Sequence, residues 1–135
     1  LRRIATNLRA LGLTPVLIRD LPDQRHQTLE EKAMFWALCS RFAIMEDSVA
    51  TGHLVELKDL VVNRVPTVVL RKAGRASSYM VAGLERDYRF IREMTYDNSS
   101  LAAAVARAVE WAQGFVVERG EALDETYKAW RTAKR

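Results

Sequence analysis

The sequence has few of the residues that small domains use for disulfide bonds or structural metal sites. It contains one cysteine, Cys39, which excludes an intramolecular disulfide and leaves no cysteine-based zinc site. It contains two histidines, His26 and His53, so we expect no histidine-rich metal site either. With 6 glycines and 3 prolines, it is neither collagen-like nor low in complexity. We therefore expect a fold without metal or cofactor, stabilised by its own core.

Long apolar runs are also absent. No run approaches the roughly 20 residues that span a bilayer, and no signal-peptide pattern opens the sequence. These absences predict a cytoplasmic protein with no membrane partner.

What the sequence does contain is typical of a globular domain. Hydrophobic residues make up 49% and charged residues 28% of the 135 positions, enough to bury a core. The 21 basic and 17 acidic residues leave a net charge of +4, and the excess gathers between Arg64 and Arg92. Such a cluster suits a phosphate-bearing small molecule as readily as a nucleic acid, and a solvated basic rim is an equal alternative to either. Nucleic-acid binders tend to be more basic, so we do not expect a nucleic-acid partner.

Apolar periodicity predicts helices alternating with short strands. The first helix carries Leu1, Ile4 and Leu8 and stops near Gly12. A capping box at Thr28 opens the second helix, the third covers residues 52–63, and a long helix follows Asn98. We expect strands at Pro15–Ile18, Phe42–Met45, Pro66–Leu70 and Phe90–Tyr96. The alternation predicts an α/β fold with three layers and a mostly parallel sheet. Because such folds normally begin with a strand, we expect either that residues before Leu1 supply the first strand or that the sheet lacks it.

The division into parts follows from the long last helix. We expect an α/β domain over residues 1–120, with Gly114 or Gly120 breaking the helix, and a helical extension over residues 121–135. Leu123, Tyr127 and Trp130 recur at helical spacing in that extension. An amphipathic helix with no sheet left to cover tends to find a partner, so we predict a homo-oligomer.

Parallel α/β sheets bind ligands at the carboxyl ends of their strands, which directs attention to the loops after Ile18, Met45 and Leu70. In the second loop, Gly52 lies four residues before Glu56, on the same helix face, and leaves room beyond that carboxylate. Such a carboxylate can act as a nucleophile or stabilise a cation at a sugar carbon. Glu56 as an ordinary surface residue is the competing interpretation.

Neighbouring residues complete the candidate site. Asp47 and Ser48 lie at its rim, and His53 is either a ligand contact or a solvated capping residue. The third loop adds Arg75, Ser77 and Ser78, whose charge and hydroxyls suit phosphate or ribose contact, although a solvated turn would look the same.

Two segments carry a family resemblance. The run from Asp47 to Leu57, with Gly52 and Glu56, precedes the buried run Val65–Arg71; together they resemble the nucleoside 2-deoxyribosyltransferase-like and TIR-like superfamily. The loop of residues 74–80 and the ending Met94–Tyr96 before a long helix are also similar to this group. The resemblance covers roughly residues 8–112.

The resemblance implies a flavodoxin-like fold that binds a nucleotide or nucleoside. It assigns Glu56 to attack or stabilise C1′ during N-glycosidic cleavage, with Gly52 leaving room for the sugar and Asp47 and Ser48 flanking it. NAD would then be a substrate, not a cofactor. Two alternatives stay open: a non-catalytic nucleotide-sensing module and a protein-interaction domain.

Overall fold

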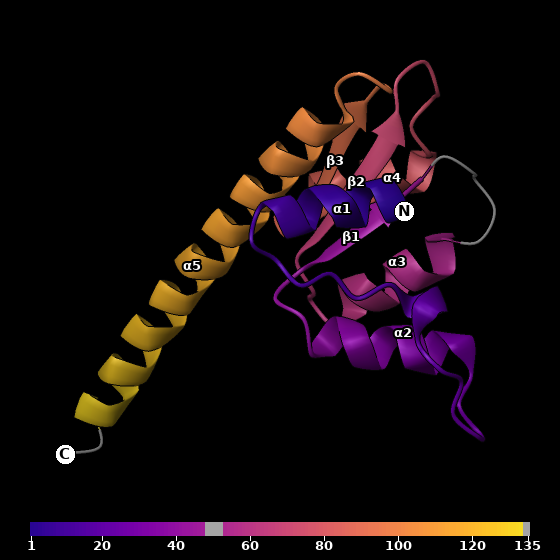
Figure 1. Ribbon diagram of the computed structural model, residues 1–135. Coiled ribbons are helices and arrows are strands. Elements are labelled where there is room, and N and C mark those ends of the chain that lie inside the picture. Colours follow the sequence, from indigo (N-terminus) through magenta and orange to yellow (C-terminus); the bar gives the residue numbers. More distant parts are fainter. Residues whose placement is uncertain (48–52, 134–135) are drawn as a thin grey trace.

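A computed structural model describes residues 1–47 and 53–133, and every structural statement below refers to these residues. Helices and strands alternate along most of the chain (Figure 1). In chain order the elements are α1 (Arg2–Ala10), the 3₁₀ turn η1 (Ile18–Asp20), α2 (Leu29–Leu38), β1 (Ala43–Glu46), α3 (His53–Val62), β2 (Thr67–Lys72), α4 (Tyr79–Asp87), β3 (Ile91–Tyr96) and α5 (Leu101–Ala133).

The sheet has three parallel strands in the order β1-β2-β3. Ala43 pairs with Thr67 and Thr67 with Ile91, so the strands start level and end at one edge. The strands expected near Phe42–Met45, Pro66–Leu70 and Phe90–Tyr96 are thus confirmed. The central strand β2 is the most buried, whereas β1 is only half-buried because it lies at an edge of the sheet.

Helices cover both faces of the sheet, giving the three layers that the sequence predicts (Figure 1). On one face, Ile4 and Leu8 of α1 pack with the first half of α5 over Val68 and Leu70. On the other face, α3 and α4 pack over Val69 and Ile91. The architecture is an open, all-parallel α/β sandwich, compatible with a flavodoxin-like fold.

The expected strand at Pro15–Ile18 is wrong. Residues 15–17 form no strand, and η1 begins at Ile18. A β-strand is stable only in a hydrogen-bonded ladder, and no strand of the described chain pairs with this segment. Pro15 also has no N–H to donate to a ladder. Apolar composition alone therefore does not make this run a strand.

The expected break in the last helix is also wrong, because α5 continues through Gly114 and Gly120 to Ala133. An interior glycine costs a helix only about 1 kcal/mol relative to alanine, so by itself it does not end a helix that has good helix formers on both sides. Despite its 33 residues, α5 contains too many charged residues to cross a membrane, and no other described helix qualifies.

Candidate functional site

An open pocket of about 550 Å³ lies at the carboxyl edge of the sheet. It combines the ends of all three strands with the starts of α1 and α5. We call it the cationic pocket; its lining residues are Leu1, Arg2, Arg3, Ile4, Arg19, Glu46, Lys72, Arg75, Tyr96, Asn98 and Leu101.

Positive charge dominates this pocket. Five cationic side chains against the single carboxylate of Glu46 give +5 − 1 = +4 among the lining residues. The first turn of α1 contains no acidic residue, so its orphan N–H groups add to the positive potential. Arg3 donates to the carbonyl oxygen of Asn98 at 3.1 Å, which links α1 to the loop between β3 and α5.

The one acidic side chain in the pocket is held in place. Glu46 ends β1 and Tyr96 ends β3, two strands that flank β2. The Tyr96 hydroxyl donates to Glu46 Oε1 at 2.6 Å, and both residues are half-buried. A short bond to an ionised acceptor is a strong one, so it fixes the direction of the carboxylate.

The loop that carries Arg75 is anchored by a nearly buried ion pair. Arg71 Nε lies 2.9 Å from Glu93 Oε1, and the two side chains are 15% and 11% exposed. A second nitrogen of the Arg71 guanidinium donates to the carbonyl oxygen of Arg75. The Ser77 hydroxyl donates to Glu93 at 2.9 Å. These contacts hold both ends of the loop while the Arg75 side chain lines the pocket.

Arg19 reaches the pocket by a different route. It lies in η1, and the segment after η1 is tied to α2 by the buried Lys32, which donates to the Leu21 carbonyl and pairs with Asp23. Lys32 is therefore part of the scaffold that holds this side of the pocket.

The structure does not bring all the residues predicted for the site to one place. Arg75 lines the cationic pocket. Asp47 is half-buried next to Glu46 and donates its backbone N–H to the Leu70 carbonyl at 2.9 Å. Ser77 is bonded to Glu93, and Ser78 is the N-cap residue of α4.

Three predicted site residues cannot be placed in this way. Ser48 and Gly52 lie outside the described residues. His53 begins α3, but its side chain is outside what the structure describes.

Glu56 lies in the first turn of α3 and is half-buried. It takes part in an interaction within the chain and is not among the described lining residues of the cationic pocket. Helix α3 packs on the face of the sheet opposite to α1, through Leu57 and Val61. Among the described residues, Glu46 is the only carboxylate that lines the cationic pocket.

Sequence reasoning pointed to the sheet edge where the cationic pocket lies, but it did not select most of the cations. Arg19, Glu46 and Lys72 follow or end the three segments that pointed to this edge. Arg2 and Arg3 are distant in sequence, and only the packing of α1 across the sheet brings them there. The one available signal was the run of arginines in a first helix without any acidic residue.

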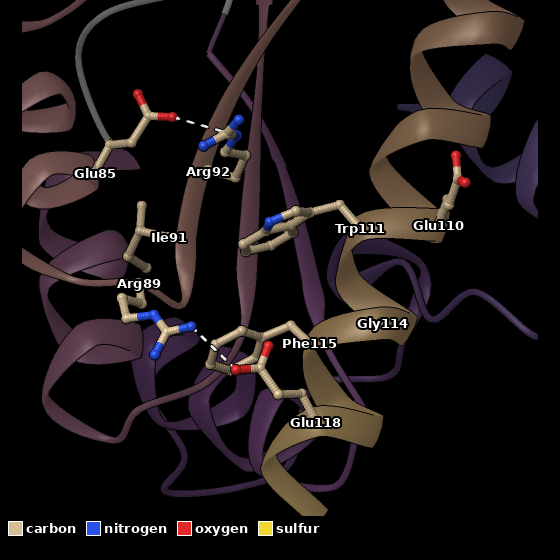
Figure 2. A pocket seen from close by; sticks show the side chains of 9 residues that line it. All are labelled: Glu85, Arg89, Ile91, Arg92, Glu110, Trp111, Gly114, Phe115 and Glu118. Carbon is tan, nitrogen blue, oxygen red and sulfur yellow. Dashed lines mark hydrogen bonds and ion pairs between the residues drawn. The ribbon is translucent and has the colours of Figure 1, made fainter.

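A second pocket, of about 520 Å³, lies between α4, β3 and α5 (Figure 2). The rings of Trp111 and Phe115 stack at 5.9 Å on its α5 side. Its two arginines are engaged, since Arg89 pairs with Glu118 at 3.0 Å and Arg92 lies 3.7 Å from Glu85. Its three glutamates and two arginines leave a charge of −1, so this pocket is less suited to an anion than the first.

Within residues 1–47 and 53–133, no three His, Cys, Asp or Glu side chains gather as a metal site would require. The chemistry of the cationic pocket is instead that of anion binding, with one oriented carboxylate among the cations. Neither a protein-family model nor a curated protein matches this chain.

Proposed function

We propose that the chain binds a nucleotide in the cationic pocket. The convergence of five cationic side chains on one carboxylate, at the carboxyl edge of a parallel sheet, carries this proposal. Open α/β sheets bind ligands at this edge. The volume of about 550 Å³ falls within the range of small-molecule sites.

The cations favour the phosphate groups of such a ligand. Lys72 and Arg75 extend from the end of β2, and Arg2 and Arg3 lie across the pocket on α1. One guanidinium group can donate two parallel hydrogen bonds to the oxygens of a phosphate, and the N-terminus of α1 contributes further donors. The resemblance to nucleoside 2-deoxyribosyltransferase-like and TIR-like proteins supports a nucleotide over other anions.

Glu46 adds a carboxylate, which a site for phosphate alone would not need. A carboxylate repels phosphate but accepts hydrogen bonds from the hydroxyls of a ribose. Because Tyr96 fixes its direction, Glu46 orients the sugar while the cations hold the phosphates. The proposed ligand is therefore a ribonucleotide, with its ribose at the β1 side of the pocket.

Isothermal titration calorimetry with adenosine, AMP and ADP tests this function. We expect affinity to rise with the number of phosphates and to fall as salt screens the cations. Lys72→Ala and Arg75→Ala should each weaken ADP binding about tenfold, as expected for the loss of one charge-assisted hydrogen bond. Arg107→Ala is the control, because Arg107 is an exposed α5 residue outside the pocket lining. Equal affinities for adenosine and ADP, or no binding, would refute the proposal.

Cleavage of an N-glycosidic bond through Glu56 is the enzymatic form of this function. In its favour, Glu56 is half-buried in the first turn of a helix that follows β1. Incubation with NAD and a panel of nucleosides, followed by chromatography of released bases, separates the two forms. Release that is lost in Glu56→Gln would establish an enzyme, and no release from the native chain would leave the nucleotide-binding module.

A further inference from the structure

The second half of α5 extends away from the rest of the fold (Figure 1). The buried residues of α5 end at Ala112, and every described residue from Val117 to Ala133 is exposed. Side-chain contacts with other elements include Arg89 with Glu118 and Arg119 with the Arg64 carbonyl. Farther along, Thr126 and Thr132 bond to carbonyls within α5 itself. Isolated helices of this length are marginal in water, so this one needs a surface to pack against.

An apolar stripe, interrupted by Gly120, runs from the half-buried Val116 into the exposed segment. Val116, Gly120, Leu123, Tyr127 and Trp130 follow one another at intervals of 4, 3, 4 and 3 residues, the spacing of a helix-pairing seam. Leu123, Tyr127 and Trp130 are 48%, 54% and 56% exposed. The stripe continues the face that α5 buries through Val105, Val109 and Ala112. The side of α5 that forms the core in its first half is thus a solvent-facing apolar side in its second.

Charge along this segment indicates what covers the stripe. Glu121, Asp124 and Glu125 come first, and Lys128 and Arg131 follow. A second copy running antiparallel, centred near Tyr127, would set Leu123 beside Trp130 of the partner subunit and Asp124 beside the partner's Arg131. A parallel copy in register would instead lay the acidic half along the acidic half and the basic half along the basic half, which is the less favourable arrangement.

We propose that two copies of this chain pair through the second halves of α5 as an antiparallel, two-fold symmetric dimer. Such a contact is self-complementary, because each subunit offers the same acidic and basic halves. The interface is small, on the order of 1,000 Å² in total, so we expect dissociation in the micromolar range. The two α/β bodies would lie at opposite ends of the helix pair.

Sedimentation velocity of the full chain between about 1 and 100 µM tests the pairing, since this range brackets the expected dissociation constant. The native chain should change from monomer to dimer across this range. Tyr127→Asp should remain monomeric throughout. Tyr79→Asp is the matched control, because Tyr79 is 96% exposed on α4, and it should dimerise like the native chain. Circular dichroism checks that each variant is folded.

Charge reversal tests the orientation. Asp124→Arg should weaken the dimer about tenfold, and adding Arg131→Asp to the same chain should restore it, because the pair is rebuilt with opposite polarity. A parallel dimer would not show this rescue. A native chain that stays monomeric at every concentration, a dimer that survives Tyr127→Asp, or a double variant that is not rescued would each overturn the proposal.

Discussion

Glu46 shows how a single hydrogen bond gives a charged residue a role that its sequence context does not reveal. In the sequence it is one of two adjacent acidic residues after a strand, and Asp47 is the one that the family resemblance selects. In the structure Glu46 lines the cationic pocket and accepts the Tyr96 hydroxyl at 2.6 Å. The bond crosses from β1 to β3, so no local pattern could have indicated it.

Tyr96→Phe removes the hydroxyl that donates this bond and keeps the aromatic ring. If Glu46 orients a ribose, affinity for a ribonucleotide should fall about threefold to tenfold, the worth of one hydrogen bond. Affinity for the matching 2′-deoxynucleotide should change less, because that ligand lacks one hydroxyl that Glu46 could accept. Calorimetry of ADP and 2′-deoxy-ADP measures both values. Tyr79→Phe is the control; equal losses for the two ligands would contradict a role in sugar recognition.

At the scale of elements, an apolar run formed the expected strand where another strand lay beside it to pair with. Pro66–Leu70 is apolar on both faces and became the central strand β2, whose Val68 and Leu70 are fully buried. Pro15–Ile18 looks similar but has no partner strand in the described chain. Pairing is a property of the whole sheet, so a single segment cannot report it. For the candidate site, the loops after the strands predicted the sheet edge at which the pocket lies. The arginines of α1 could not be predicted, because only the packing of α1 places them at that edge.

The Arg71–Glu93 ion pair links β2 to β3 near the site and is nearly buried. Glu93→Gln leaves Arg71 nearly buried without its counter-charge and weakens the bond to Ser77. We expect the free energy of unfolding to fall by about 3 kcal/mol, as for other broken buried pairs. Urea denaturation measures this change.

Asp87→Asn provides the matched comparison for that experiment. Asp87 pairs with Arg86 at 2.8 Å, but the two side chains are 54% and 77% exposed. Solvent screens such a pair, so its loss should be hardly detectable. Equal destabilisation by the two substitutions would show that burial does not set the strength of the Arg71 and Glu93 pair.

The start of α5 depends on Asp97, whose carboxylate accepts the backbone N–H groups of Ser99 and Ser100 and the Ser99 hydroxyl. The Ser99 hydroxyl and the bonds from Ser100 lower the pKa of Asp97 to about 2. A lowered pKa stabilises the fold above the unfolded value of about 3.9, and this contribution is lost as the pH falls toward 2.

Asp97→Asn should therefore lower the melting temperature at neutral pH, because a carboxamide is a weaker acceptor than a carboxylate. The difference from the native chain should shrink between about pH 4 and pH 2, as the native carboxylate becomes protonated. Thermal melts followed by circular dichroism across this range measure it. A difference that does not depend on pH would contradict the capping role.

At the scale of the whole molecule, α5 connects two surfaces with separate tasks. Its first residue, Leu101, lines the cationic pocket, and its last half carries the proposed dimer stripe. With 33 residues the helix is about 50 Å long, so the two surfaces do not share contacts. Ligand binding and pairing should accordingly be independent properties of the chain.

Ending the chain after Gly120 tests this independence. All buried residues of α5 precede that position, from Leu101 to Ala112, and so do the contacts of Glu118 and Arg119 with Arg89 and Arg64. The shortened chain should keep a cooperative thermal transition, with a midpoint within about 5 °C of the native one, as expected for a loss below 1 kcal/mol. It should bind ADP as the native chain does and be monomeric at every concentration. Loss of ADP binding together with a lost transition would show that residues 121–135 belong to the α/β domain itself, because a separate extension could be removed without unfolding the core.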